Sequence, residues 1–469
     1  MIKKFIKQSN LILNNKKNNF IIKSISCLHF LKFHPEYLNF HKKTYFFNFI
    51  YIIKLSTRIY NFVSYHLLNF FFHKNTKIPK SSVLIISHCV NKSDLLNKKK
   101  QDRYFGKLRK ILNNKKYSYF FTLLNHTKHR SFYLNTINRK SNTIIIDDYL
   151  PIRLEIKVFF LNLYHFFFII FDKKNFKGIK KKMLLSLFDS QTAVSLKMFY
   201  VVKYFLLKTN SKFLILTYEG YSWERLAIFS ANSIDRNIKC IGYQHTLITK
   251  NNYSIFRSVL GGFNPDCIWT STKWAFKNFK NHKNNNINIV NSGSLRILKK
   301  IKKNKKNKNN VLVIPEGIYS ECYKLFDFII KCALENKKLN FFWQLHPVIS
   351  SNKILDHYKS SLISLPKNII ILNKNKKIKN CYFAIYRGSS AIIESVRFGC
   401  IPIYFNNNED LNIDPIGISR KNFVNTSADF ADIIKKSHKL SNHSINYYNK
   451  IKNKIYSKLN EKELLKTLK

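Results

Sequence analysis

The sequence predicts an α/β fold made of two doubly wound, Rossmann-like domains that face a cleft. Two observations lead to this prediction. Short apolar segments typical of buried strands alternate with helical segments, and they do so in two separate blocks of the chain. A run of lysine and asparagine at 299–310, "KKIKKNKKNKNN", lies between the blocks, has no apolar periodicity and marks a linker.

The first block contains short apolar runs that end in polar residues, such as "SSVLIISH" (81–88) and "FLILTYEG" (213–220). Their length and their Val, Ile, Leu and Phe content favour strands buried on both faces. We predict strands at 81–88, 117–126, 142–150, 213–220, 238–245, 266–271 and 287–294, and helices at 102–114, 152–171, 190–207, 222–235 and from about 272.

The second block repeats the alternation after the linker. We predict strands at 311–317, 340–347, 368–373, 381–386 and 401–405, and helices at 320–336 and 428–438. In "YRGSSAIIESVRFGCIPIYF" (386–405) a further helix is expected to start at Ser389 or Ser390, directly after Gly388. A helix N-terminus at the end of a strand is a favourable place to hold a phosphate.

The predicted organisation has five parts, which is consistent with two or three domains of ordinary size. They are a basic, aromatic N-terminal extension (1–75), a first Rossmann-like domain (76–298), the linker (299–310), a second Rossmann-like domain (311–440) and a helical C-terminal tail (441–469).

The chain of 469 residues is very basic, with 82 Lys and Arg against 25 Asp and Glu, a net charge of +57. This excess fits an anionic partner, such as nucleic acid, an anionic membrane or a phosphorylated ligand. It also fits the codon bias of an AT-rich genome, which enriches Lys, Asn, Ile and Phe. Charge alone does not choose between these interpretations.

Several features predict a cytoplasmic protein. The eight cysteines include no C-x-x-C pair, which indicates reduced, buried thiols, and the N-terminus lacks the apolar core of a signal peptide. The apolar run Val158–Phe171 is short for a membrane span, and 45–72 is broken by Lys54 and Arg58. Both segments are interpreted as buried helices or as helices lying on an anionic membrane surface.

Several reaction classes lack their motifs. The chain has no Walker loop, no G-x-G-x-x-G and no G-x-S-x-G nucleophile elbow. It also has no H-E-x-x-H, no zinc-type His/Cys spacing and no D-x-D. We therefore predict neither a metal site nor a cofactor.

The candidate site residues follow predicted strands, because ligands of open parallel sheets bind outside the carboxyl ends of the strands. In the first block these are Glu219 and His245; in the second they are His346, Arg387 and the turn 388–390. Purely structural roles stay open. Glu219 can be a solvated loop carboxylate, and His245 can simply bond the backbone.

The residues around the turn also have two interpretations each. Ser389 and Ser390 can bind phosphate or act as ordinary helix N-caps. Glu394 lies one turn after Ser390, so it can reach the same ligand, or it can pair with Arg397 on the surface.

Four segments together resemble bacterial surface-carbohydrate biosynthesis proteins of the O-antigen and capsule type, which are GT-B-type glycosyltransferases. They are "YEGYSWERLAI", "IKCIGYQHT", "WQLHP" and "YRGSSAIIESVRFGCIPIYF". The likeness covers roughly residues 80–440 and includes "DRYFGKL" (102–108). The family's acidic residue, Trp-Glu pair and strand-end His correspond to Glu219, Trp223, Glu224 and His245.

The resemblance implies a metal-independent transfer of sugar from a nucleotide sugar to a lipid-linked or growing surface glycan. The first domain would bind the acceptor and the second the donor nucleotide. Glu219 would be the base, with His245 as the alternative, and Trp223 and Glu224 would lie on the acceptor side. The donor would contact His346, Arg387, Gly388, Ser389, Ser390, Glu394 and Glu409.

The chain departs from the family before His346-Pro347. An Arg often precedes this dipeptide by one or two residues, whereas Gln344 and Leu345 stand here. Trp223 can also be core, and Glu224 can pair with Arg225 or a neighbouring loop.

Two other functions remain open from the sequence. The charge and the aromatic content suit a nucleic-acid-binding protein, although no RNA-binding motif is present and the basic runs fall in linkers and tails. A polyol-phosphate transferase would use the same fold and phosphate pocket. Peripheral contact with an anionic inner membrane is expected for a transferase with a lipid-linked acceptor.

Overall fold

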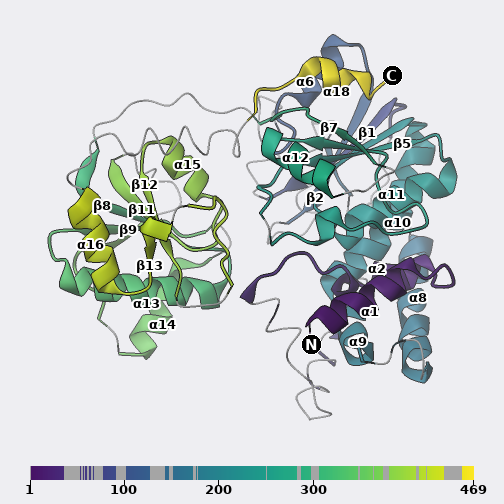
Figure 1. The fold of residues 1–469 in the computed structure, drawn as a ribbon. Helices are drawn as coiled ribbons and strands as arrows, with labels where there is room; N and C mark the ends of the chain where they lie inside the picture. Colours follow the sequence, from purple (N-terminus) through teal and green to yellow (C-terminus); the bar gives the residue numbers. More distant parts are fainter. Residues whose placement is uncertain are drawn as a thin grey trace. The chain divides into compact units, whose positions relative to one another are not determined.

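The computed structural model gives the fold of the chain in two compact units (Figure 1). The first unit comprises Met1–Thr246, Asn252–Ile297 and Tyr456–Lys469, and the second comprises Leu247–Asn251 and Leu298–Ile455. The residues described are 2–35, single positions between 38 and 67, 78–90, 102–126, 143–146, 152–172, 176, 178–249, 251–282, 287–296, 306–346, 349–362, 364–372, 380–407, 411–418, 420–437 and 457–469.

The first unit is built on a seven-stranded parallel sheet in the order β3-β2-β1-β4-β5-β6-β7. The strands are β1 (Val83–Cys89), β2 (Tyr119–Asn125), β3 (Thr143–Ile145), β4 (Phe213–Thr217), β5 (Lys239–Gln244), β6 (Cys267–Thr270) and β7 (Asn288–Val290). The order runs outward in both directions from β1 and β4. The direction of winding therefore switches between these two strands, as in other doubly wound sheets.

Helices cover both faces of this sheet. One face packs on α6 (Leu108–Asn114) and α18 (Glu461–Lys466), whose leucines join the core formed by Val83, Ile85 and Ile215. The other face contacts α10 (Ser190–Thr209) and α11 (Ser222–Ile234). The unit also contains α1 (Ile2–Asn14), α2 (Phe20–Ser24), α8 (Ile152–Phe171), α9 (Lys180–Leu187) and α12 (Lys273–Asn281).

The second unit has a six-stranded parallel sheet in the order β10-β9-β8-β11-β12-β13. Its strands are β8 (Asn307–Ile314), β9 (Asn340–Trp343), β10 (Ile369–Ile371), β11 (Cys381–Tyr386), β12 (Ile401–Phe405) and β13 (Phe423–Val424). Its helices are α13 (Tyr319–Glu335), α14 (Ser351–Ser360), α15 (Ile392–Arg397) and α16 (Ser427–Ser437). The winding switches between β8 and β11.

Alternate residues of β8 and β11 enter two separate cores. Val311, Val313, Phe383 and Ile385 pack with α13, α14 and α16, whereas Leu312, Ile314, Ala384 and Tyr386 pack with α15. Both faces of the sheet are thus buried, which explains why these strands are apolar throughout. The predicted fold class, two doubly wound α/β units with parallel sheets, is confirmed.

The two ends of the chain fold into the first unit. The buried residues of α1 and α2 belong to it, and the Tyr253 amide donates to the Leu31 carbonyl. At the other end, Tyr117 donates to the Leu468 carbonyl, and the Trp269 indole donates to Thr467. The segment 2–34 therefore lies in this unit.

The predicted linker overlaps a strand, because Asn307–Asn310 form the start of β8. These residues are polar because the strand begins at the exposed margin of the sheet, where Asn307 pairs with Cys381. Residues 297–305 lie outside the described part of the chain.

Two predictions about environment can be compared with the structure. All eight cysteines lie in described residues; none forms a disulfide, Cys27 is half-buried and the other seven are buried. Among the described helices, none is both long enough and apolar enough to cross a bilayer.

Candidate active site

A cluster of titratable side chains lies at the switch point of the first sheet, where β1 and β4 end. His88 is the next-to-last residue of β1, Thr217 ends β4, and His126 follows β2. The His88 ring bonds both neighbours: Nδ1 lies 2.7 Å from His126 Nε2, and Nε2 lies 2.6 Å from Thr217 Oγ1. Burial, together with the nearby His126, lowers the pKa of His88 to about 3, so the ring is neutral near pH 7.

Glu219 and His245 face each other beside this cluster. They follow adjacent strands, β4 and β5, and Glu219 Oε1 lies 3.5 Å from His245 Nε2. The two side chains are 23% and 7% exposed, respectively. Burial raises the pKa of Glu219, although Thr246, Lys32 and Arg296 oppose the shift. Burial and the positive charge of Arg296 hold the pKa of His245 well below its usual range. The pair is therefore a carboxyl group of raised pKa and a neutral imidazole.

Glu224 fixes the loop that carries Glu219. One of its carboxylate oxygens accepts from three successive backbone amides, those of Glu219, Gly220 and Tyr221, at 2.8, 2.7 and 2.8 Å. Gly220 has a φ of +83°, and a Cβ there would lie 2.5 Å from the Ser254 carbonyl oxygen. The loop can therefore take this course only with glycine at this position.

Trp223 and Tyr104 form walls of the cluster. The Trp223 ring stands edge-on to His88, with centroids 5.5 Å apart, and Tyr104 stands edge-on to His245 at 4.7 Å. The Arg296 guanidinium lies 5.3 Å from the centroid of the Tyr104 ring. Trp223 is thus buried and yet in contact with the site.

Asp102 fixes the position of Tyr104. Its carboxylate accepts from the Ser87 hydroxyl at 2.9 Å and from the amides of Tyr104 and Phe105 at 2.8 and 2.6 Å. The segment "DRYFGKL" therefore contains a turn that positions the Tyr104 ring against His245, directly after β5.

In the second unit, Arg387 is held internally. Its Nε bonds Glu321 of α13, and its Nη1 donates to the Asn406 carbonyl at 3.0 Å. Both members of the pair are almost fully buried. Burial raises the pKa of Glu321, but Lys324 and Arg387 outweigh it, so the net shift is downward. The guanidinium therefore links α13 to the end of β12, a role that the sequence did not indicate.

Glu316 lies at the switch point of the second sheet, two residues after β8. A Cβ on Gly388 would lie only 2.3 Å from Glu316 Oε1, so the glycine makes room for this carboxylate. His346 is close by: burial lowers the pKa of its ring, and the charge of Glu316 opposes the shift. Gly388 and His346 therefore both lie near the Glu316 carboxylate. Glu316 was not among the predicted site residues.

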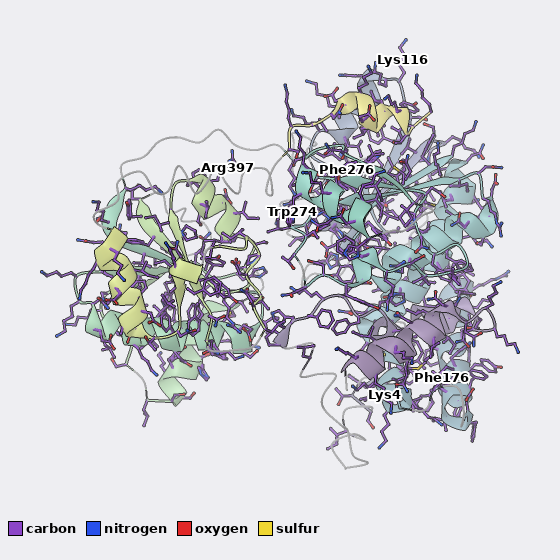
Figure 2. The ribbon with its side chains drawn as sticks, in the orientation of Figure 1. Lys4, Lys116, Phe176, Trp274, Phe276 and Arg397 are labelled. Atoms are coloured by element: carbon purple, nitrogen blue, oxygen red, sulfur yellow. The ribbon has the colours of Figure 1, made fainter. Side chains whose placement is uncertain are left out.

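The helix after Gly388 begins later than predicted. α15 starts at Ile392, because Ser389, Ser390 and Ala391 form a turn, and its N-cap is Ala391. The Ser389 hydroxyl is buried and accepts weakly from the Ala391 amide at 3.4 Å, whereas Ser390 and Glu394 are exposed. Neither serine is the N-cap residue. Arg397 ends this helix (Figure 2).

The remaining predictions concern Glu409 and metals. Glu409 and Pro347 lie outside the described residues. Within the described part of the chain, no three His, Cys, Asp or Glu side chains are grouped so that they could hold a metal ion.

Sequence reasoning did not select His88, His126, Thr217, Tyr104 or Glu316 as site residues. The rule that found Glu219 and His245 applies to three of them, since the predicted strands 81–88 and 117–126 both end in histidine and Glu316 follows β8. No sequence signal shows that two histidines 38 positions apart bond each other.

No protein-family model and no curated protein matches the chain in sequence. Similar solved structures include the UDP-GlcNAc 2-epimerase from Neisseria meningitidis bound to UDP-GlcNAc, at 12% identity and a TM-score of 0.46 over 82% of this chain and 99% of that one. The S. aureus MnaA–UDP co-structure matches at 11% and 0.47 over 83% and 96%. The glycotransferase of kitacinnamycin matches at 8% and 0.46 over 80% and 95%. Likeness at this level carries no activity from one protein to another, and the fold class stands on the sheet topology of this chain.

Proposed function

We propose that the chain is a glycosyltransferase that moves a sugar from a nucleotide-sugar donor to a hydroxyl of a surface-polysaccharide acceptor, of the O-antigen or capsule kind, without a metal. The observation that carries the proposal is the Glu219–His245 pair at the end of β4 and β5, with Glu219 Oε1 3.5 Å from His245 Nε2. Ligands of doubly wound sheets bind at this edge, and the pair includes a carboxyl group of raised pKa.

Glycosyl transfer needs a base at the acceptor. The acceptor oxygen forms a bond to the anomeric carbon, the bond from that carbon to the donor phosphate breaks, and the acceptor proton moves to the base. A carboxylate with a raised pKa accepts a proton more readily than an ordinary one. We assign this role to Glu219. Neutral His245 lies close enough to orient the carboxylate or to take the proton itself.

The histidines beside this pair add no positive charge to the site near pH 7, although Lys32 and Arg296 oppose the upward pKa shift of Glu219. His88 is neutral because of its pKa of about 3, and it is fixed at both ring nitrogens. The imidazole that faces the Glu219 carboxylate is His245, and it is neutral as well because its pKa lies well below the usual range. Trp223 lies against His88, and we assign it to the acceptor side together with Glu224, which acts through the loop it holds.

We assign donor binding to the second unit. His346, the backbone of 388–390 and the exposed Ser390 would hold the phosphates, and Glu394 and Glu409 would bond hydroxyls of the ribose or sugar. Arg387 contributes by position, since its guanidinium is already bonded to Glu321 and to backbone carbonyls next to the Gly388 turn.

The acceptor in this proposal is a lipid-linked or growing glycan, which places the enzyme in the cytoplasm with peripheral access to the inner membrane face. The reaction as assigned uses no cofactor beyond the nucleotide-sugar substrate. Base and phosphate ligands would be supplied by side chains and backbone amides.

A ligand screen by thermal denaturation tests the proposal. The purified chain is heated with nucleotides, nucleotide sugars, CDP-polyols and RNA, alongside His346→Ala/Ser390→Ala and a matched control, His357→Ala/Ser360→Ala on α14. A ligand that binds the folded state raises Tm with concentration. We expect one nucleotide-sugar family to do so in wild type and control but not in the site variant. A response to CDP-polyols alone, or to RNA alone, would contradict the proposed donor.

A further inference from the structure

Helix α8 (Ile152–Phe171) has one buried face and one exposed apolar face. Val158, Asn162, His165 and Ile169 are buried, and His165 Nε2 lies 2.9 Å from Asn19 Nδ2. On the opposite side, Ile156, Phe160, Tyr164, Phe167, Phe168 and Phe171 are between 43% and 75% exposed. They follow at intervals of three or four residues and thus form one stripe, here called the α8 stripe.

The α8 stripe is long, aromatic and basic at one end. A helix of 20 residues extends about 30 Å. Arg153 and Lys157 are exposed and, at the helical repeat, lie on the same face as Ile156, Phe160 and Tyr164. No described side chain of the stripe is acidic. The face therefore combines five aromatic rings with two cations.

The stripe belongs to a group of helices at one end of the first unit. α8 contacts α2 and α9, and α1 contacts α2. Figure 1 shows these helices together, away from β7 and α18, and Figure 2 shows Lys4 of α1 and the buried Phe176 among them. Exposed lysines continue here, including Lys4 and Lys181.

Three further exposed apolar residues lie in the same unit. Ile53, Tyr60 and Leu67 lie on helical backbone at intervals of seven residues and are 49–71% exposed. Thr57 Oγ1 bonds the Ile53 carbonyl, and Ser64 Oγ bonds the Tyr60 carbonyl, as expected in a helix. Exposed apolar surface thus recurs where the chain is most aromatic.

We propose that the α8 stripe docks on the surface of an anionic lipid bilayer, with the helix lying in the plane of the interface. An exposed stripe of large apolar side chains is unusual in a water-facing helix and marks an interaction surface. Aromatic rings favour the headgroup region, and Arg and Lys beside them favour anionic lipid. A net charge of +57 favours the same partner. The inference rests on the proposed function in one respect, since it names the surface by which the enzyme would reach the membrane; the docking itself does not require the transfer reaction.

Vesicle flotation of the full chain tests the inference. The vesicles are phosphatidylcholine with or without phosphatidylglycerol. The stripe variant is Phe160→Ser/Tyr164→Ser/Phe171→Ser. The matched control, Leu207→Ser/Leu260→Ser/Leu334→Ser, removes three leucines that are 54–60% exposed elsewhere. We expect wild type and control to float with anionic vesicles, and the partition coefficient of the stripe variant to fall at least about tenfold.

The charge contribution is measured with Arg153→Gln/Lys157→Gln. Each lost charge is expected to weaken binding to anionic vesicles about fivefold at low salt and to leave binding to neutral vesicles unchanged. The nucleotide-dependent Tm is measured on the same variants. If it is retained while flotation is lost, membrane docking and donor binding are separate properties.

Three outcomes would overturn the inference. Equal flotation of the stripe variant and wild type would mean that general lysine charge, and not the α8 stripe, binds the vesicles. Absence of flotation for the wild type would exclude the bilayer as partner. Absence of flotation together with a concentration-dependent dimer that only the stripe variant loses would assign the stripe to a second copy of the chain.

Discussion

Gly388 leaves the space that the Glu316 carboxylate occupies, since a Cβ at position 388 would lie 2.3 Å from Glu316 Oε1. The φ of Gly388 is not positive, so the backbone allows alanine, and the three atoms nearest to its Cβ would all belong to this carboxylate. Gly388→Ala should therefore destabilise the second unit by about 1–3 kcal/mol through overpacking. Urea unfolding measures the loss.

The matched test of this contact is Gly388→Ala/Glu316→Ala, in which the smaller partner leaves room for the new methyl group. The double variant should recover part of the stability relative to the sum of the single changes. Strict additivity would show that the two positions are not in contact.

Arg387 is predicted to stabilise the fold and not to bind the donor directly. Removing one member of a buried ion pair leaves the other charge uncompensated and typically costs about 3–5 kcal/mol. Arg387→Met should therefore lower the free energy of unfolding, but by less than this amount, because Lys324 still bonds the buried Glu321. Arg387→Met/Glu321→Leu should be more stable than Arg387→Met. If Arg387→Met kept wild-type stability and lost only nucleotide binding, the role as donor ligand would be correct instead.

Glu224 is predicted to act on the site through the loop 219–221. Glu224→Ala removes the acceptor of three backbone amides and should cost about 1–2 kcal/mol, as for lost helix caps. Glu224→Gln keeps one acceptor oxygen and should cost less. Glu463→Ala, whose side chain is 40% exposed and pairs with Lys466, is the control. Equal stability of the alanine variant and wild type in thermal unfolding would argue against this role.

His88 predicts a loss of stability in acid. Burial and the neighbouring His126 give it a folded pKa of about 3, against about 6.5 for an unfolded histidine. Below about pH 6.5 His88 is protonated in the unfolded chain, whereas in the folded chain it stays neutral down to about pH 3. The contribution of His88 is therefore complete above about pH 6.5, and it falls by up to about 1.4 kcal/mol per pH unit as the pH drops through this window.

The check compares wild type with His88→Asn, which cannot take up this proton. In urea unfolding between about pH 7 and pH 4, the free energy of unfolding of the variant should fall less steeply with decreasing pH. The difference in slope should be at most about 1.4 kcal/mol per pH unit, the value for one proton. The same slope for both proteins would show that His88 titrates normally in the folded state.

Much of the fold and part of the site could be predicted from the sequence. Runs such as Val311–Ile314 and Cys381–Tyr386 are apolar at every position. A strand needs this pattern when both faces of its sheet are covered, so the pattern predicts a buried parallel sheet. Glu219 and His245 were found because parallel strands place their carboxyl ends at one edge. That rule depends only on the local pattern.

The rest depends on partners far away in the chain. Arg387 looks available in its own segment, but Glu321, 66 residues earlier, neutralises it. Ser389 and Ser390 looked like N-caps, but a turn delays α15 to Ile392. A local pattern cannot show which distant carboxylate meets a guanidinium or where a turn gives way to a helix.

The most direct test of the central claim is a rate measurement on wild type, Glu219→Gln and Glu219→Ala. The substrate is the nucleotide sugar that raises Tm in the ligand screen, and the measured quantity is the rate at which the free nucleotide is released. Donor binding is measured on the same samples by calorimetry. If Glu219 is the base, both variants should bind the donor as wild type does and lose at least about a hundredfold in kcat. The wild-type rate should also fall in acid, through the raised pKa of Glu219. A Glu219→Gln enzyme that retains the wild-type rate would contradict the account.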